Sequence, residues 1–391
     1  MKSGKLLLAS SLMLALAAPV AVQAAPVAVQ AAEEEDKEKT AFEKRRGLAE
    51  RIKKLRELRK RLPHPVPSGL FGIYAFPEAG QGVAGINYQH HEFDGLIQGS
   101  DSVSAETVVT TVPNRFFGDP MQPPTLRVVP EHVEADVAFP FANFAINDRF
   151  ALVGLMPLVQ KKTTLETFAG PTGTKSLGTN TVKSRGLGDI KFGTIYKAYN
   201  SKDYRHNFLV DLGLSVPTGS ITETDYSLTP MNTKVKTRLA YGMQLGTGTW
   251  DSFFGLVYWG QNENWGWGSQ YLATIPLESE NKEGWRYGDK HELTAWMSYS
   301  WNPDLVTSLR IRGETQDQIH GMDPEIYGAG LGADPDNYGG ERVEVGIGIN
   351  WMPVPANNLS VELLFPVHQD RNGVQAEHDF SLAFSWRTGF F

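Results

Sequence analysis

The sequence predicts an all-β protein: a transmembrane antiparallel up-and-down β-barrel of about twelve strands, preceded by a short helical extension. Three observations predict this fold class. The final stretch alternates large apolar with small or polar side chains, the chain begins with an export signal, and the sequence between them consists of alternating segments of roughly ten residues separated by turn residues. We therefore expect a protein of the Gram-negative outer membrane, in contact with lipid and lipopolysaccharide.

The final stretch, 377–391, has the pattern of a strand with lipid on one side and water on the other. Large apolar side chains occupy every second position: Phe380, Leu382, Phe384 and Trp386. The chain ends in Phe390-Phe391, and this end resembles the C-terminal sorting strand of outer-membrane proteins, which implies the outer-membrane assembly machinery as a partner. The alternation places Phe390, not Phe391, in phase with Trp386. The alternative is an edge strand of a soluble β-sandwich.

The N-terminus has the pattern of a signal peptide. Lys2 and Lys5 precede an apolar run at 6–18, and small residues allow cleavage after Ala24 or after Ala31. We expect residues 1–24 to be removed. The run is too short to span a bilayer as a helix, and no later stretch reaches the roughly 18 apolar residues that a helical span needs. The chain has no cysteine, which suits an oxidising envelope.

Residues 33–62 predict a basic amphipathic helix, because leucine and isoleucine recur along one helical stripe. The segment carries 12 Lys and Arg against 8 Asp and Glu. Four interpretations remain open: a solvated periplasmic helix, a plug in the barrel mouth, an oligomerising coil, or a helix on anionic lipid. The export signal argues against nucleic acid as a partner. A proline-rich linker follows at 63–79, and the barrel takes up 80–391.

The barrel region divides into alternating segments. Twelve strands are predicted at 81–93, 132–145, 150–163, 188–199, 206–216, 234–245, 251–261, 290–301, 305–314, 341–351, 359–368 and 377–391. Short turns near 147, 201, 248, 303 and 355 alternate with longer loops, as expected when short turns lie in the periplasm. The long segment 262–289 contains a further alternating stretch, so fourteen strands are the alternative.

The polar faces of these strands predict the lining of the lumen. The second strand contributes Glu134 and Asp136. The predicted constriction consists of five residues on three adjacent strands: Arg310, Arg312, Arg342, Glu344 and Glu362. Two further lumen residues, Asp211 and Arg238, lie on the predicted strands 206–216 and 234–245. The mixed signs favour ion pairs in a narrow interior over an ion-selective ring. The alternative is an ion-pair network with a purely structural role.

Four tryptophans, Trp259, Trp265, Trp267 and Trp285, have two interpretations. They form an outer aromatic loop that a solute meets first, or they belong to the girdle at the lipid interface. No catalytic motif accompanies them. Ser308 and His368 both have inward phase, but an intervening strand separates them. We therefore expect no enzyme activity, no metal and no cofactor.

Five stretches, in this order and spacing, resemble the outer-membrane family labelled as the MetA pathway of phenol degradation, whose members are described as transporters. They are 184–199 (SRGLGDIKFGTIYKAY), 212–220 (LGLSVPTGS), 246–258 (GTGTWDSFFGLVY), 337–353 (NYGGERVEVGIGINWMP) and 362–373 (ELLFPVHQDRNG). The resemblance implies a porin-like barrel for uptake of small, often hydrophobic or aromatic, compounds. It implies no catalytic residues and does not account for the helix at 33–62.

The sequence thus predicts a passive or gated channel for a small solute, with a narrow charged lumen. The alternative is a structural or partner-binding barrel whose lumen is closed by ion pairs and the N-terminal helix. Neither the solute nor the oligomeric state follows from the sequence.

Overall fold

The computed structural model describes residues 76–203, 205–354 and 356–390, and before them only Arg46, Gly47, Glu50, Pro67, Ser68 and Leu70. The chain forms two compact units, 1–55 and 56–391. In the first unit the described residues are helical, and Arg46 pairs with Glu50 at 3.5 Å. The predicted signal peptide lies outside the described residues, as do most of the predicted helix and linker. None of the described helices has the length and hydrophobicity of a membrane-spanning helix.

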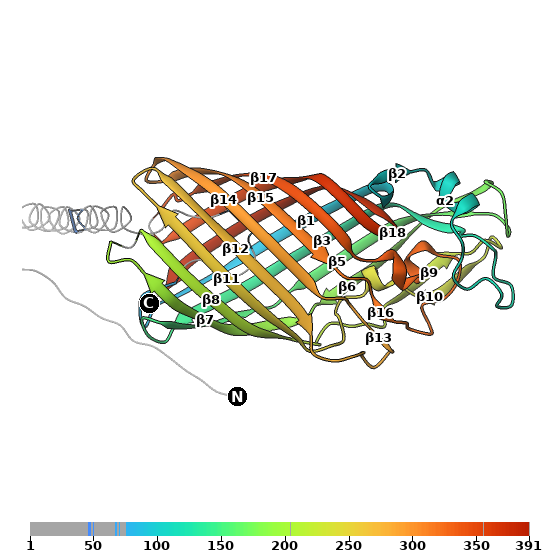
Figure 1. Ribbon diagram of the computed structural model, residues 1–391, viewed down its shortest axis with the longest axis horizontal. Coiled ribbons are helices and arrows are strands. Elements are labelled where there is room, and N and C mark those ends of the chain that lie inside the picture. The colour runs from blue at the N-terminus through green and yellow to red at the C-terminus, as the bar shows by residue number, and fades with distance from the viewer. Residues whose placement is uncertain are drawn as a thin grey trace, which may run out of the picture. The chain divides into compact units, whose positions relative to one another are not determined.

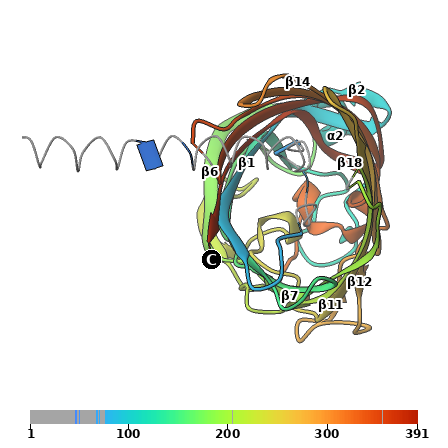
Figure 2. The ribbon, with the colours of Figure 1, turned by 90° about the vertical axis from the view of Figure 1, so that its left-hand side faces the viewer.

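The second unit is a closed antiparallel β-barrel (Figures 1 and 2). Each wall strand pairs with its neighbours, and β1 pairs with both β18 and β3, which closes the ring. The wall strands are β1 (Gly82–Gly99), β3 (Val128–Ala145), β4 (Phe150–Leu155), β5 (Leu158–Phe168), β6 (Ser176–Leu187), β7 (Ile190–Asn200), β8 (His206–Val216), β11 (Asp251–Gln261), β12 (Trp265–Pro276), β14 (Lys290–Asn302), β15 (Leu305–Gln316), β17 (Gly340–Trp351) and β18 (Asn357–Phe390).

Eleven labelled strands make the closed ring, but β18 crosses the wall twice. Its first residues pair with Trp351 and its last residue, Phe390, pairs with Gly82, at the same end of the barrel. Its middle residue Arg371 pairs at the opposite end with both Gly340 and Gly99. The chain must therefore reverse within β18, and Gly373 next to this point has a φ of 60°. The wall thus has twelve passes, which agrees with the predicted number.

Two passes are each built from two strands. Strands β4 and β5 both pair with β3, and they are separated at Met156-Pro157. Strands β6 and β7 form the next pass in the same way. Strand β6 pairs with β5, and β7 pairs with β4 and β8. A separate hairpin of β9 (Thr224–Leu228) and β10 (Lys234–Arg238) lies beside β6, where Asn180 Nδ2 donates to Tyr226 O at 2.9 Å.

The two ends of the barrel differ in the length of their connections. Short connections at 146–149, 201–205, 262–264, 303–304 and 352–356 make the tight-turn end, which corresponds to the periplasmic side of such barrels. The opposite, loop-side end carries the remaining elements: β2 (Asp101–Val103), α2 (Ala105–Thr111), β13 (Trp285–Arg286), β16 (His320–Gly321) and the 3-10 turns η1 (Tyr241–Met243), η2 (Leu331–Ala333) and η3 (Pro335–Asn337).

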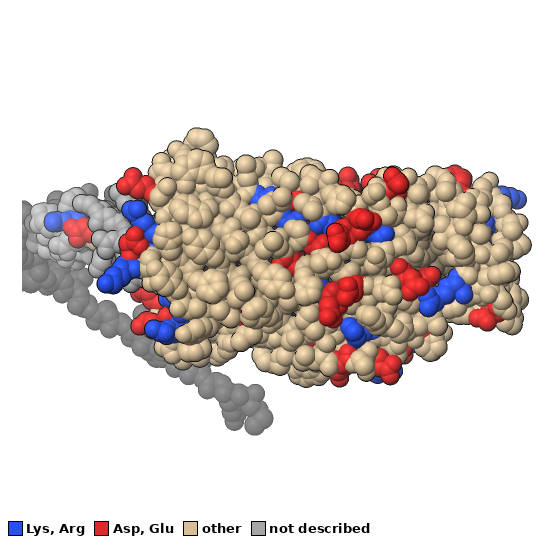
Figure 3. All heavy atoms as spheres, in the orientation of Figure 1, with Lys and Arg blue, Asp and Glu red and all other residues tan. Residues whose placement is uncertain are grey.

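The outer face of the barrel carries an apolar belt. Exposed apolar side chains alternate with buried ones along the strands, for example Val345, Ile347 and Ile349 on β17. On the face shown in Figure 3, charged side chains gather at the tight-turn rim and over the loop-side half, and the surface between them is nearly free of charge. Phe390 is exposed in phase with Trp386, as predicted. The protein is therefore an outer-membrane β-barrel.

Two details of the predicted strand order are wrong. Residues 234–245 are not a wall strand: they form β10 of the loop-side hairpin and then η1, so the turn near 248 is not on the tight-turn side. The missing pass is β12, inside the segment 262–289. The prediction failed because Val235 and Leu239 line an internal cavity, and their alternation mimics a lipid-facing strand. The stretch 164–186, left between the predicted strands 150–163 and 188–199, contains most of β6 (Ser176–Leu187).

Candidate functional site

A cavity of about 1100 Å³ lies inside the loop-side half of the barrel; we call it the loop-side cavity. Strands β3, β5 and β6 form its wall, and the β9–β10 hairpin and the segment 326–333 cover it. Its lining is mainly apolar and includes Val133, Leu165, Val182, Leu239, Met243 and Ile326. The cavity has the size and the apolar character of small-molecule sites in proteins.

The apolar face of β3 points into the barrel. Val133 and Ala135 line the loop-side cavity, and Phe139 and Phe141 line a smaller cavity nearer the tight-turn end. Because side chains alternate along a strand, Glu134 and Asp136 point outward. The sequence-based assignment of these two acids to the lumen is therefore wrong.

Glu134 and Asp136 instead join a polar network on the outside of the wall. Lys162 donates to Glu134 at 2.7 Å, His90 contacts Asp136 at 2.9 Å, and the Tyr88 hydroxyl donates to Asp136. The prediction failed because it assumed that polar side chains face the lumen on every strand. On this side of the barrel the interior is the apolar phase.

Lys161 is a cation in the lining of the loop-side cavity. Its Nζ donates to the carbonyl oxygens of Gly242 at 2.8 Å and Gln244 at 2.6 Å, both in the turn around η1. Nearby, the Thr163 hydroxyl donates to Met243 Sδ at 3.0 Å. Lys161 is not among the residues predicted from the sequence, although it is in phase with Val159 and Thr163 on β5.

Arg238 lies in the cover of the loop-side cavity and not in a lumen constriction, which corrects its predicted position. Its guanidinium donates to Asp323 at 2.8 Å and to Glu325 at 2.9 Å, and it lies 3.4 Å from Glu283. These pairs tie the β9–β10 hairpin to two other loops. Arg238 was misplaced because 234–245 was interpreted as a wall strand.

Tyr241 and Trp285 form the packed centre of the loops above the cavity. Their rings lie 5.0 Å apart, and both side chains are fully buried. The Tyr241 hydroxyl accepts a hydrogen bond from the Asp323 N–H at 3.0 Å. Burial raises the pKa of Tyr241 to about 12, so its hydroxyl stays neutral at physiological pH. The loop-side end is therefore covered by ordered, packed segments.

An ion-pair network lines the opposite wall, on β14, β15, β17 and β18. Arg312 contacts Glu344 at 2.7 Å and Glu314 at 2.6 Å and also pairs with Glu292. Arg342 contacts Glu314 at 3.4 Å. The separate pair Arg310–Glu362 has an Nε–Oε1 distance of 2.9 Å. The structure thus brings the five predicted constriction residues to the interior face of three adjacent strands, as their phase indicated.

Ser381, His378 and Glu344 have the order of a hydrolase triad. Ser381 Oγ lies 2.9 Å from His378 Nε2, and His378 Nδ1 lies 3.5 Å from Glu344 Oε1. A nucleophile must reach its substrate, however, and Ser381 is 5% exposed and lines neither cavity. The Ser308 and His368 considered from the sequence do not meet: Ser308 is buried and His368 is exposed.

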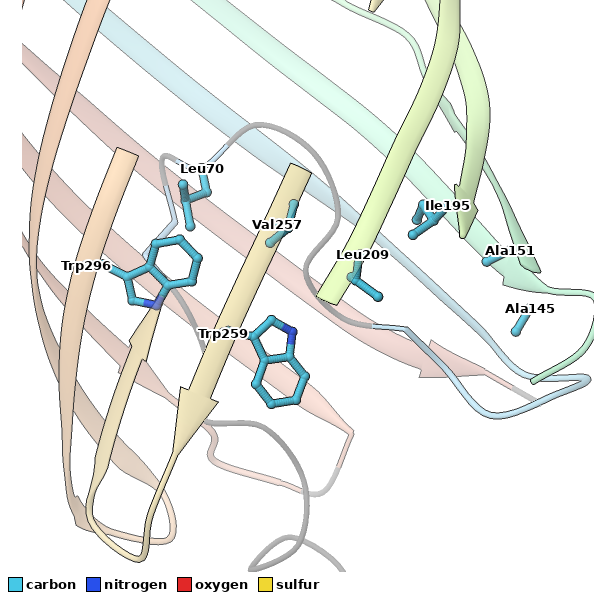
Figure 4. Close-up of a cluster of buried hydrophobic side chains, with 8 residues drawn as sticks. All are labelled: Leu70, Ala145, Ala151, Ile195, Leu209, Val257, Trp259 and Trp296. Carbon is cyan, nitrogen blue, oxygen red and sulfur yellow. The ribbon is translucent and has the colours of Figure 1, made fainter. Parts of the chain in front are cut away.

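An apolar cluster narrows the interior at the tight-turn end (Figure 4). Leu70, which precedes the first strand, packs with Trp259 of β11 and Trp296 of β14. Ser68 anchors the same segment, because its hydroxyl donates to Ala383 O at 3.4 Å and its carbonyl accepts from Asn87 Nδ2. Ser68 and Leu70 therefore lie inside the barrel.

The smaller cavity, of about 90 Å³, lies beside this apolar cluster. Leu70, Phe139, Phe141 and Phe253 contribute apolar surface, and Asp211 contributes a buried carboxyl group. Neither oxygen of Asp211 has a hydrogen-bond partner among the described residues. Asp211 thus lies in the lining of this cavity, and its role in a constriction stays a prediction.

The four predicted tryptophans do not form one aromatic loop. Trp259 points into the barrel, and Trp285 is buried among the loops. Trp265 and Trp267 lie on β12 beside the tight turn 262–264, and Trp265 is exposed on the outer face. This position matches the girdle alternative for these two residues. The tryptophans were grouped because they are close in sequence, but successive residues of a strand point to opposite faces, and Trp259 pairs across the hairpin with Gly268, which follows Trp267.

The fold resembles that of solved outer-membrane channels. The COG4313 outer membrane channel from Pseudomonas putida F1 superposes with a TM-score of 0.53 at 14% identity, over 82% of this chain and 99% of that one. The toluene transporter TodX of P. putida gives 0.40 at 10% identity, over 81% and 91%. A Pseudomonas aeruginosa FadL homologue gives 0.38 at 10%, over 80% and 90%. No protein-family model and no curated protein matches the sequence.

Proposed function

We propose that this protein is an outer-membrane channel for small apolar solutes, including aromatic ones. The observation that carries the proposal is the loop-side cavity: about 1100 Å³ of mainly apolar space between the barrel wall and its loops. Small-molecule sites in proteins are concave and mainly apolar, as this cavity is. The COG4313 channel, which shares the fold, and the sequence resemblance to transporters of the phenol-degradation family both support this function.

The solute would pass from the loop-side cavity along the ion-pair network to the tight-turn end. Arg310, Arg312, Arg342, Glu344 and Glu362 are our proposed constriction, with Asp211 below them. Because arginines and glutamates neutralise each other there, the passage presents no ring of a single sign. We therefore propose a narrow, charged but balanced lumen that selects neither sign of charge.

Leu70 and its neighbours would close this passage at the tight-turn end. In this proposal the plug includes more than the predicted helix at 33–62. Leu70, which follows that helix in sequence, packs in one cluster with Trp259 and Trp296. Removing 33–62 would leave Ser68 and Leu70 in place. Removing 33–76 would take away both, so comparing the two deletions separates the helix from the segment inside the barrel.

The experiment that tests the proposal is single-channel conductance in planar bilayers. We expect low conductance for the mature protein and for the 33–62 deletion, and a clearly larger conductance for the 33–76 deletion. Toluene added on the loop side should reduce the current through the open variant, because it enters the apolar cavity, whereas glucose should not. A 33–76 variant that is folded but silent at every voltage would rule out the channel.

The alternative function is a structural or partner-binding barrel with a closed lumen. Its support is the number of interior ion pairs, together with the packed loops over one end and the apolar cluster at the other. This function predicts that none of the deletions conducts and that toluene does not bind. Interaction of the C-terminal end with the assembly machinery is a further proposal, supported by the pairing of Phe390 with Gly82 at the closing seam.

A further inference from the structure

The loop-side cavity has an unbalanced charge. Two cationic residues, Lys161 and Arg238, line it, and no Asp or Glu does so among the described residues. The two cations differ in their partners. Arg238 is paired with Asp323 and Glu325, which lie behind the cavity wall, so its charge is already compensated. Lys161 has no acidic partner within ion-pair distance among the described residues, and its contacts are backbone carbonyls.

An ammonium group in apolar surroundings is costly unless an anion compensates it. Lys161 Nζ has three donors, and two of them are used by Gly242 O and Gln244 O. The carbonyls also fix the position of Nζ at the cavity wall. One donor therefore remains for a group inside the cavity; Asp189 acts on the ammonium through its charge but forms no ion pair with it.

The space around Lys161 is apolar. Leu165, Val182, Leu239 and Met243 form one hydrophobic cluster that extends from β5 and β6 to η1, and Val133 and Ala135 of β3 face the same cavity. A ligand that fits must therefore combine an apolar body with one anionic group. A carboxylate matches a single lysine, because one oxygen can accept the remaining hydrogen bond and the charge is delocalised over both.

We propose that the loop-side cavity binds apolar monocarboxylates, with the carboxylate on Lys161 and the apolar body against the β5–β6 cluster. This inference rests on the proposed function, since it names a solute class for the same cavity. It makes the cavity a charge-selective entry site above a lumen whose charges are balanced. The passage would then sort solutes at the cavity and not at the ion-pair network.

Neighbouring lysines on β5 provide the test. Lys161 points into the cavity, and Lys162 points outward, where it pairs with Glu134 at 2.7 Å. The probes are 4-ethylbenzoate and the neutral 4-ethylbenzamide, titrated calorimetrically into the full-length mature protein in nanodiscs of zwitterionic lipid. We expect the wild type to bind the benzoate about ten- to hundredfold more tightly than the amide, the range expected for a charge-assisted hydrogen bond.

Lys161→Met should remove this preference, so that the benzoate and the amide bind about equally, whereas Lys162→Met and Lys161→Arg should retain it. Equal binding of the two probes by the wild type would overturn the inference without any variant, as would an unchanged preference in a folded Lys161→Met protein. These outcomes are separate from the channel test: charge-selective binding without conductance in the 33–76 deletion supports the site and rejects transport. Conductance without charge selectivity supports transport and rejects the site.

Discussion

Arg310 and Glu362 illustrate, at the scale of single residues, why interior charges depend on each other without requiring a role in transport. Their side chains are 3% and 0% exposed, and a 2.9 Å hydrogen bond joins them. Desolvating two charges offsets much of their attraction, so the pair as a whole contributes little net stability. Removing only one partner is different, because it leaves an uncompensated charge in a confined interior.

We expect Arg310→Met to lower the free energy of unfolding by about 3–5 kcal/mol, because Glu362 is left buried without its guanidinium. The double variant Arg310→Met/Glu362→Leu should recover a large part of this loss. Urea titration, monitored by tryptophan fluorescence, measures the free energy of unfolding of the single and the double variant. Arg205→Met is the matched control, because the Arg205–Asp203 pair at a tight turn is exposed and should contribute less than about 1 kcal/mol. A double variant no more stable than the single one would contradict this account.

At the scale of elements, the β9–β10 hairpin is a part of the cavity cover that lies outside the main sheet. It pairs with itself over five residue pairs and is fixed to the loops by Arg238 at its end. A two-stranded hairpin is at best marginally stable by itself in water, so its position depends on such contacts. The same hairpin lines the loop-side cavity, and its opening would admit a solute.

Arg238→Gln should therefore loosen the hairpin, because it leaves Asp323, which is fully buried, without its cation. Hydrogen–deuterium exchange of residues 224–238 should become faster by about tenfold or more, while exchange in β15 and β17 stays unchanged. Lys236→Gln, an exposed position on the same strand, is the control and should not alter exchange. Equal exchange in wild type and Arg238→Gln would show that the ion pairs do not hold the cover.

The face of β3 shows what an element's pattern leaves open. Its alternation of apolar and polar side chains predicts a strand, and the strand is there. The alternation, however, does not say which of the two faces of the strand points into the barrel. Val133 and Phe141 face inward because the interior on this side is an apolar cavity, and Glu134 faces outward because Lys162 of the neighbouring strand is there to pair with it. Only the register between β3 and β5 makes this choice.

At the scale of the whole molecule, closure of the ring depends on the seam between β1 and β18, which lie at opposite ends of the barrel region in sequence. Gly85 sits at this seam opposite Arg387. A Cβ added at Gly85 would collide with the backbone carbonyl oxygen of Trp386. The close approach of the two strands therefore requires glycine here.

We expect Gly85→Ala to destabilise the barrel by about 1–3 kcal/mol, because backbone at the seam must shift to make room. Gly154→Ala on β4 is the matched control, since the nearest atom to its added Cβ would be Lys191 O at 4.0 Å. The measurement is the fraction of heat-modifiable folded protein on a gel across a urea series. If both alanine variants unfold at the same urea concentration as the wild type, close approach of β1 and β18 at Gly85 does not determine the stability of the barrel.

The sequence by itself determined the local properties of this protein: alternating strands, tight turns, an outer belt in phase with Phe390, and arginines and glutamates in inward phase on the last strands. These follow from periodicity, which is a property of neighbouring residues. The tertiary structure alone decided which long segment crosses the wall, 234–245 or β12, and which side of β3 is inside. It also placed Lys161 and Leu70 in the interior. An apolar residue facing a cavity and one facing lipid leave the same pattern in a strand, and only the packing of distant segments distinguishes them.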